Sequence, residues 1–245
     1  MTNKREENKR ENRKALKKFI LIILAGGVFG GVLGGFGFVM EERIMDVCYW
    51  LEGMLPEIAF IALLVTAGIF HLATFIFYRQ SVSLYQQWDG EEEKIAEQID
   101  KKLGYVMWGE SINTILNFFF FGMGIGKTEL DIPLLVVFIL NIVLVVIFQQ
   151  KMVDLTKVMN PEKHGSVYDR KFLDKWMESC DEAEKMDIYH AAWSSYRVMS
   201  VAYVGAWLVT YLAHMFCGMD FFASIVVTVL WLIQSCVYCY KSIYR

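Results

Sequence analysis

Long runs of apolar residues alternate along the chain with shorter stretches rich in charged residues. An α-helix needs roughly 20 apolar residues to cross a hydrocarbon core of about 30 Å. Six runs approach or exceed that length, and they cover residues 19–40, 55–78, 103–125, 132–150, 198–217 and 221–240. The pattern therefore predicts an all-α, polytopic membrane protein with six transmembrane helices in a lipid bilayer.

The composition agrees with membrane spans. Hydrophobic residues make up 56% of the 245 residues, compared with roughly 45–50% in ordinary soluble domains. The first run is longer than the apolar core of a signal peptide, about 7–15 residues, and a long charged stretch precedes it. We therefore expect an uncleaved anchor, with residues 1–18 as a basic tail and residues 19–245 as a single membrane domain.

Positive charge falls on one side of the predicted spans. Of the 24 Lys and Arg residues, only Arg43 and Lys127 fall in the loops after the first, third and fifth spans. Because cytoplasmic loops retain an excess of Lys and Arg, this distribution predicts a cell-membrane protein with both termini in the cytoplasm. The outer loops are then short and acidic, which excludes a large extracellular domain. Most of the water-facing chain lies in two cytoplasmic segments, 79–102 and 151–197.

These two segments are predicted to be helical hairpin extensions between spans two and three and between spans four and five. In the first, a turn at residues 89–90 interrupts the pattern, and apolar residues then recur at helical spacing over 95–106. In the second, a turn at residues 160–161 precedes an apolar and aromatic face over 172–196. Acidic residues precede the return span in both. They indicate either a solvated helix face or a docking surface for a cytoplasmic protein partner.

Glycines recur every four residues in two rows along the first span. They are Gly26, Gly27, Gly30, Gly31, Gly34 and Gly35. Overlapping GxxxG patterns of this kind let a second helix approach closely in lipid. Because five other predicted spans are available, we interpret this face as a packing surface within the chain. A homo-oligomer formed through the glycine-rich span is the alternative.

Polar side chains within membrane spans are costly, and they mark function or contacts between helices. On the third span, Glu110, Asn113 and Asn117 share one face because their spacing is i, i+3 and i+7. They either line a polar path or hydrogen-bond to neighbouring helices, for example to Asn141. We favour contact between helices over a translocation site. A lone histidine such as His71 is likewise interpreted as a packing residue rather than as a ligand or proton relay.

No set of catalytic, metal-binding or cofactor-binding residues stands out in the sequence. The stretch 122–128 resembles a phosphate-binding loop, but the motif GxxxxGK[ST] requires a glycine where Phe121 stands. The five cysteines lack a full set of metal ligands and are expected to be free thiols. Lys and Arg are interleaved with Asp and Glu, which excludes a nucleic-acid-binding face. We therefore predict a protein that is not an enzyme and that uses no cofactor or metal.

The second cytoplasmic segment carries a distinctive string of residues. It reads Met159-Asn-Pro-Glu-Lys-His-Gly165, then Asp169, Phe172, Lys175-Trp176 and Glu178-Ser-Cys-Asp-Glu-Ala-Glu-Lys185. The string resembles the signature of a family of multi-pass membrane proteins of Gram-positive bacteria, known only as a domain of unknown function. The basic tail and the span layout are also similar, so the resemblance covers almost the whole chain. It implies a bacterial cell membrane and no activity. The signature positions, without assigned roles, are Asn160, Pro161, Gly165, Trp176, Cys180, Asp181 and Glu182.

Two functional hypotheses follow from these patterns. The first is a non-enzymatic integral membrane protein, an accessory, immunity or sensory component that acts through its cytoplasmic hairpins. The alternative is a transport protein, or a permease-like subunit that works with a separate ATPase. Long cytoplasmic extensions combined with short outer loops resemble the layout of exporter membrane domains, but a shared layout does not fix a function.

Overall fold

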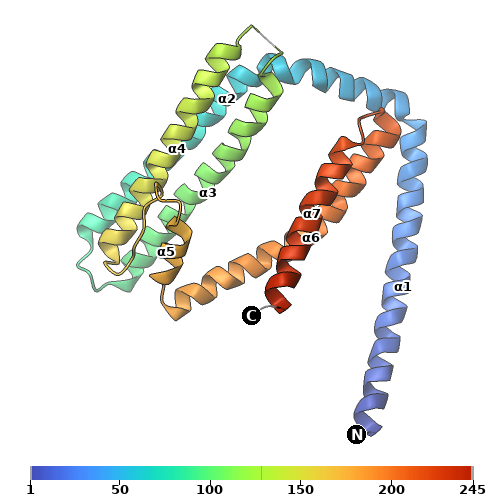
Figure 1. Cartoon of the computed structure of the whole chain (residues 1–245), viewed down its shortest axis with the longest axis horizontal. Coiled ribbons are helices and arrows are strands. Elements are labelled where there is room, and N and C mark those ends of the chain that lie inside the picture. The colour runs from blue at the N-terminus through green and yellow to red at the C-terminus, as the bar shows by residue number, and fades with distance from the viewer. Residues whose placement is uncertain (1, 128, 244–245) are drawn as a thin grey trace. The chain divides into compact units, whose positions relative to one another are not determined.

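The chain is described by a computed structural model that covers the backbone of residues 2–127 and 129–243. Within these ranges, the side chains of residues 2–12, 14, 22, 29, 33, 34, 36–38, 41, 217 and 242 lie outside the description. The described residues form seven α-helices and no strand, which confirms the predicted all-α class (Figure 1). The helices are α1 (Thr2–Val39), α2 (Glu41–Gln87), α3 (Glu93–Gly124), α4 (Asp131–Met159), α5 (Phe172–Glu178), α6 (Glu182–Cys217) and α7 (Phe222–Ile243).

Five of the described helices are long and apolar enough to cross a membrane, which indicates a membrane protein. They are α1, α2, α4, α6 and α7. Helix α3 is not among them, because Glu110, Asn113 and Asn117 lower the hydropathy of its central turns. The number of spans and the orientation of the chain therefore stay predictions.

The helices extend beyond the predicted spans. Met40 is the one turn residue between α1 and α2. The outer loop expected at residues 41–54 is instead the first part of α2, so that expectation is wrong. Residues 41–54 contain no proline and a single glycine, and nothing there stops the helical hydrogen-bond ladder. Pro56 lies inside α2, where it removes one N–H donor from that ladder.

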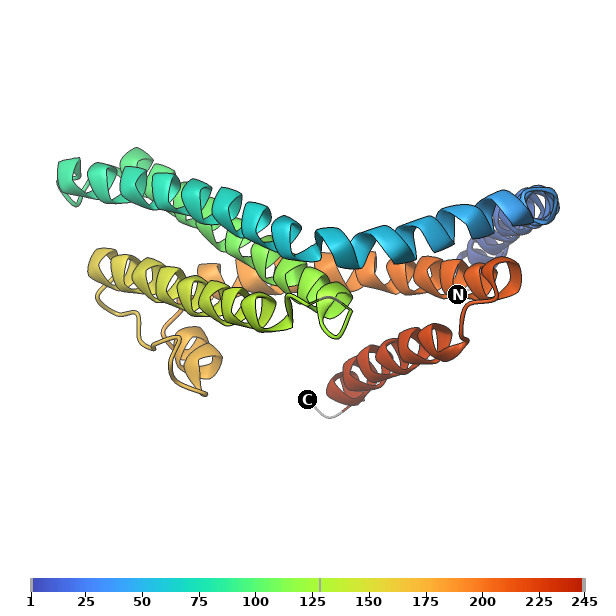
Figure 2. The same ribbon diagram turned by 90° about the horizontal axis from the view of Figure 1, so that it is seen from above.

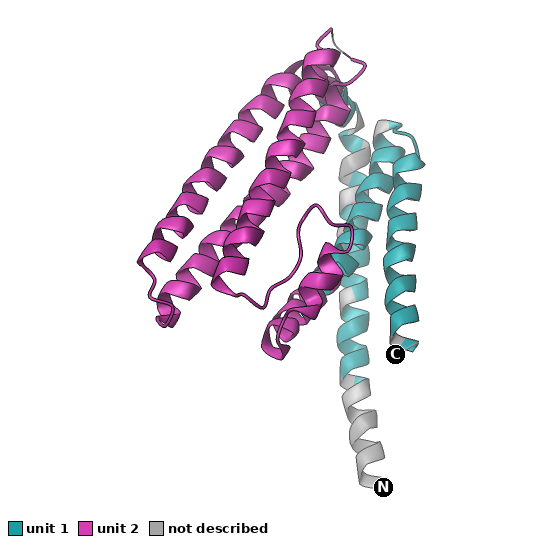
Figure 3. Ribbon diagram, turned by 60° about the vertical axis from the view of Figure 1, so that its left-hand side comes forward, with its two compact units in different colours: residues 1–49, 197–245 teal, residues 50–196 magenta. Residues whose placement is uncertain are grey.

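The chain divides into two compact units, Met1–Tyr49 with Arg197–Arg245 and Trp50–Tyr196 (Figure 3). In the first unit, the Ser224 hydroxyl on α7 donates a hydrogen bond to Thr210 Oγ1 on α6 at 3.0 Å. Most large apolar side chains of this unit are exposed. Exposure of this kind is expected of helices that face lipid.

The second unit contains α3 and α4 together with most of α2, and these three helices lie side by side (Figures 1 and 2). Where α3 begins, its Ile99 and Leu103 pack against Leu155 and Met159 of α4. Trp88, directly after α2, packs against this cluster. The helical spacing that predicted an apolar face over residues 95–106 therefore corresponds to a packed core.

At the other end of these helices, Gly124 brings α3 close to its neighbours. A methyl group at Gly124 would lie 2.8 Å from Leu134 Cδ2 of α4 and 2.9 Å from Ala59 Cβ of α2. Real carbon atoms do not approach that closely, so only a hydrogen atom fits at this position. Gly124 thus sets the distance between three helices.

A short turn joins α2 to α3. Asp89 Oδ1 accepts hydrogen bonds from the backbone N–H groups of Glu91 at 2.9 Å and Glu92 at 3.1 Å. These bonds favour the charged carboxylate and lower the pKa of Asp89. Gly90 follows with a φ of 90°, a conformation that a glycine adopts without strain. The turn predicted at residues 89–90 is therefore confirmed.

Candidate functional site

The polar face predicted on α3 is buried between α2 and α4. Glu110 and Asn113 are 0% exposed and Asn117 is 1% exposed. His71 reaches Glu110 from α2, and Asn141 reaches Asn113 from α4. We call His71, Glu110, Asn113 and Asn141 the polar cluster.

Hydrogen bonds connect all four side chains of the polar cluster. His71 Nδ1 lies 3.2 Å from Glu110 Oε1, and His71 Nε2 lies 2.6 Å from Asn141 Oδ1. The two asparagines form a reciprocal pair, in which Asn113 donates to Asn141 at 3.0 Å and Asn141 donates back at 3.3 Å. The imidazole ring of His71 also stacks on the ring of Phe148, with the two ring centroids 5.7 Å apart. The polar cluster thus joins three helices, and the helix surfaces around it are apolar.

Asn117 lies two turns further along α3 and makes a separate contact. Its Nδ2 donates to the carbonyl oxygen of Phe138 on α4 at 3.2 Å. Its Oδ1 is buried without a hydrogen-bond partner among the described residues. The geometry of the column from Glu110 to Asn117 is therefore that of helix-to-helix hydrogen bonding.

Sequence reasoning identified Glu110, Asn113, Asn117 and the neighbour Asn141, but it treated His71 as an isolated packing residue. The contact between His71 and Glu110 spans 39 residues of sequence. One feature of the sequence could have indicated the contact between His71 and Glu110. A single carboxylate and a single imidazole on neighbouring apolar helices compensate one another more cheaply than either is buried alone.

A second group of side chains lies between α4 and α6, in residues 160–181, which we call the 160–181 segment. Helix α4 ends at Met159 with Asn160 as its C-cap, and the chain then folds back along this helix. Gln150 Oε1 accepts hydrogen bonds at 2.8 Å from both the Ser166 hydroxyl and the Val167 N–H. Lys157 donates to the carbonyl oxygen of Gly165 at 3.0 Å. The loop thus retraces about 13 Å of α4, at 1.5 Å per residue.

Gly165 is one of the signature positions, and its backbone conformation explains why a glycine stands there. Its φ is 123°, which side chains other than hydrogen rarely allow. A methyl group there would also lie 3.0 Å from the Phe172 ring. Both observations indicate that a larger residue at position 165 would strain the loop where it folds back along α4.

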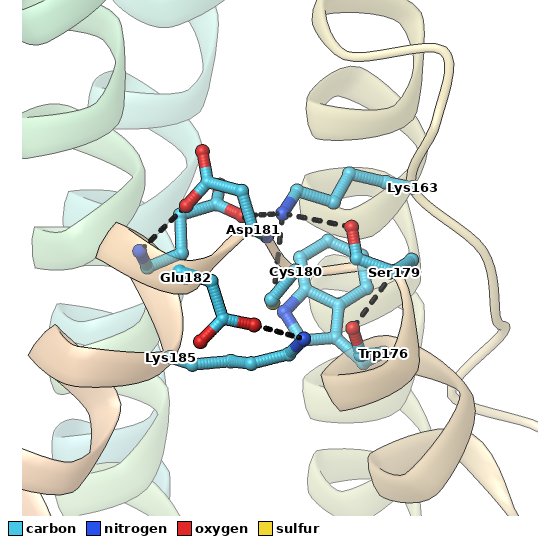
Figure 4. Close-up of polar contacts among 8 residues, drawn as sticks. Lys163, Trp176, Ser179, Cys180, Asp181, Glu182 and Lys185 are labelled. Carbon is cyan, nitrogen blue, oxygen red and sulfur yellow. Dashed lines mark hydrogen bonds and ion pairs between the residues drawn. The ribbon is translucent and has the colours of Figure 1, made fainter.

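Lys163 lies at the centre of the 160–181 segment and is 4% exposed (Figure 4). Its ammonium forms an ion pair with Glu184 and lies 3.5 Å from both the carbonyl oxygen of Ser179 and the Cys180 sulfur. The Trp176 ring centroid is 5.8 Å away, a cation–π distance. Burial alone lowers the pKa of Lys163, but the hydrogen bond and charge of Glu184 outweigh it and raise the pKa. Lys163 is therefore a buried cation.

The acidic string after Cys180 starts α6. The N–H of Glu184 donates to Asp181 Oδ1 at 2.8 Å, and the N–H of Asp181 donates to Glu184 Oε2 at 3.0 Å. This reciprocal arrangement is a capping box, which satisfies two backbone donors at a helix start. The expected continuous helical face over 172–196 is therefore wrong, since the chain breaks between α5 and α6. The capping box stabilises a new helix start at α6, so α5 does not continue into α6.

The structure gathers some of the signature positions and not others. Trp176 and Cys180 surround Lys163, and Asp181 caps the helix whose Glu184 holds the same lysine. Glu182 is almost fully exposed beside Lys185. Asn160 and Pro161 mark the end of α4, and sequence reasoning did not single out Lys163 although it lies between Pro161 and Gly165.

An open polar cleft of about 820 Å³ lies on the 160–181 segment. Its lining residues are Glu162, His164, Gly165, Ser166, Asp169, Lys175, Glu178 and Ser179. Asp169 is ion-paired with Lys175, and this contact lowers the pKa of Asp169 and raises the pKa of Lys175. Among the residues that the structure describes, no group of three His, Cys, Asp or Glu side chains is placed to hold a metal ion.

The glycine-rich face of α1 has no close neighbour in the described chain. A methyl group at Gly26, Gly27, Gly30, Gly31 or Gly35 would have no heavy atom within 4 Å, whereas the Gly34 side-chain position lies outside the described residues. The cysteines Cys180, Cys236 and Cys239 are free thiols. Packing within the chain and homo-oligomer formation both stay predictions for the glycines.

Comparison with known proteins identifies a family but no activity. No curated protein and no solved structure matches the chain. The family described as "Protein of unknown function (DUF3169)" matches residues 11–242. Because that match covers nearly the whole sequence, including α2 to α6 and the 160–181 segment, the chain belongs to the DUF3169 family of proteins of unknown function.

Proposed function

We propose that this chain is a non-enzymatic integral protein of a bacterial cell membrane, an accessory component that binds a cytoplasmic protein partner through the 160–181 segment. The observation that carries the proposal is the fixed shape of that segment. Gln150 and Lys157 hold it against α4, and the buried Lys163 holds α5 against the start of α6.

A simple connection between two helices does not require such contacts. Each doubling of the length of a flexible loop costs only about 0.6 kcal/mol in closure entropy. Burial of a lysine, in contrast, is unfavourable unless a partner compensates its charge. Here Glu184, Ser179 and Trp176 all contact Lys163, so the segment keeps one surface shape. A surface with one shape is what a protein partner recognises.

The charges of the cleft define the partner. Three carboxylates line it, from Glu162, Asp169 and Glu178, and the one lysine there is paired with Asp169. Among the described residues that line the cleft, carboxylates thus outnumber lysines by two, although the charge of Lys175 also acts on Glu178. This excess favours a basic, Lys- or Arg-rich segment of the binding protein. Electrostatic complementarity of this kind sets specificity and association rate more than affinity.

Charge reversal in the cleft tests the docking proposal. We expect full-length protein in mild detergent to retain a specific cytoplasmic protein, and the E162K/E178K double variant to lose it. The E91K variant places the same change on the other cytoplasmic turn, on an exposed side chain, and it is expected to bind as the wild type does. Quantitative mass spectrometry of the three eluates is the measurement. Equal recovery by all three proteins, or no protein recovered above background, contradicts the proposal.

We also infer six spans, with α3 as the third, and both termini in the cytoplasm. The support for α3 is that its central turns bury Glu110 and Asn113 and expose large apolar side chains. Met107, Trp108, Ile115 and Phe118 are all exposed, whereas Glu110 is not. A soluble helix has the opposite pattern, and a helix that faces lipid has this one.

Chemical labelling in intact cells tests this topology. In a protein whose five cysteines are replaced, a membrane-impermeant maleimide is expected to label E129C, between α3 and α4, and not E91C, between α2 and α3. After permeabilisation both positions are expected to react. Labelling of both positions in intact cells shows that α3 does not span, and labelling of E91C alone reverses the orientation.

A further inference from the structure

The geometry points to a proton-binding site in the polar cluster: we infer that His71 and Glu110 hold one proton between Nδ1 and Oε1 at neutral pH, and that this proton joins α2 to α3. The inference concerns the buried interface of α2, α3 and α4, and it is independent of the docking surface on the 160–181 segment.

The first step is the direction of the asparagine hydrogen bonds. Asn113 Nδ2 donates to Asn141 Oδ1 and also lies 3.4 Å from Glu110 Oε2, so its amide nitrogen faces two acceptors. The reciprocal bond then fixes Asn141, whose Oδ1 faces His71 Nε2 at 2.6 Å. An amide oxygen only accepts. Asn113 Nδ2 also lies near Nε2, but at 3.5 Å, whereas the amide oxygen of Asn141 lies at 2.6 Å. The shorter contact decides, and His71 Nε2 therefore carries a hydrogen.

The second step concerns the other ring nitrogen. His71 Nδ1 faces Glu110 Oε1 at 3.2 Å. An ionised carboxylate only accepts hydrogen bonds, and so does a ring nitrogen that carries no hydrogen. One proton must lie between them for the contact to be attractive. The pair is then either an imidazolium with a carboxylate or a neutral imidazole with a carboxylic acid, and both arrangements have no net charge.

The third step is that, among the described residues, the side chains in contact with the pair carry no charge. They are Thr74 on α2, Asn113 on α3, and Asn141 with Phe148 on α4. The cation nearby is Lys151, whose ammonium lies 5.8 Å from the Phe148 ring centroid. A proton lost or gained would leave one unit of charge among these groups, where desolvation makes it unfavourable. The pair is therefore expected to keep its single proton over a wide pH range, and a forced change in protonation is expected to break the contact between α2 and α3.

The number of protons on the pair tests the inference directly. Full-length protein in lipid nanodiscs, with ¹⁵N-labelled histidine, reports the protonation of each imidazole by NMR. Infrared spectroscopy of the same sample reports a carboxylic acid band that disappears in E110Q. Single variants H71Q, H164Q, H190Q and H214Q assign the four histidine signals.

Two results support the site, and two overturn it. At neutral pH we expect either an imidazolium at His71 without a Glu110 acid band, or a neutral His71 with that band. The His71 signal is expected to stay constant from about pH 5 to pH 8, the interval in which an unperturbed imidazole changes its charge. A neutral His71 with no acid band, or an imidazolium together with the band, contradicts a pair that holds one proton. If H71Q or E110Q fails to fold, the wild-type spectra decide, because the other three variants assign the His71 signal by elimination.

Discussion

Replacement of His71 by leucine is expected to lower the free energy of unfolding by about 3–5 kcal/mol, the range measured when one partner of a buried ion pair is removed. Leucine supplies no hydrogen-bond donor, so Glu110 is left fully buried without its principal partner. Asn141 Oδ1 loses its contact with Nε2 at the same time. Reversible unfolding of the protein in mixed micelles, followed by circular dichroism, measures the loss.

A second substitution separates loss of charge pairing from loss of packing. The double variant H71L/E110L removes the uncompensated carboxylate, and we expect it to recover most of the stability, since buried ion pairs are often replaced by apolar residues at little cost. H190L changes an exposed histidine and is expected to stay within about 0.5 kcal/mol of the wild type. A loss below about 1 kcal/mol in H71L, or a double variant that is less stable than H71L, contradicts the pairing.

Gly124→Ala is expected to destabilise the three-helix contact by about 1–3 kcal/mol, the usual cost of overpacking a close-packed site. The new methyl group would meet Leu134 of α4 and Ala59 of α2 at once, at 2.8 and 2.9 Å. Leu134 has a flexible side chain, but Ala59 has none, so relief requires a shift of a whole helix. The same unfolding measurement reports the effect.

Gly122 supplies the matched control for this substitution. It lies in the same last turns of α3, and a methyl group there would meet no heavy atom within 4 Å. Gly122→Ala is expected to be neutral or to stabilise the helix by up to about 1 kcal/mol. Equal stability of the two alanine variants would show that the close approach at Gly124 is not maintained in the membrane.

The sequence predicted the helices and one half of the polar cluster. Apolar length gave the all-α class, and helical spacing placed Glu110, Asn113 and Asn117 on one buried face. Both follow from local periodicity. The pairing with His71 is different, because it depends on which helices become neighbours, and periodicity within one helix does not contain that information.

In the 160–181 segment, too, the sequence indicated the important positions but not their roles. Gly165 and Asp181 were recognised as signature positions, but their roles depend on a positive φ and on a capping box that only the folded chain reveals. The error at residues 41–54 has another cause. Charged residues on an apolar chain were interpreted as a loop, although acidic side chains are compatible with a helix and no breaker is present there.

The order of the helices along the chain has a consequence for synthesis of the protein. A carboxylate within a single helix opposes transfer into the bilayer, by up to roughly 2.5–3.5 kcal/mol at the helix centre on insertion scales. Helix α3 carries Glu110 together with two asparagines, whereas the more apolar α2 emerges from the ribosome first and already carries His71. If α3 is the third span, as we propose, the imidazole is in place before the carboxylate arrives, and entry of α3 into lipid is favoured as one half of a helical pair instead of as a lone segment.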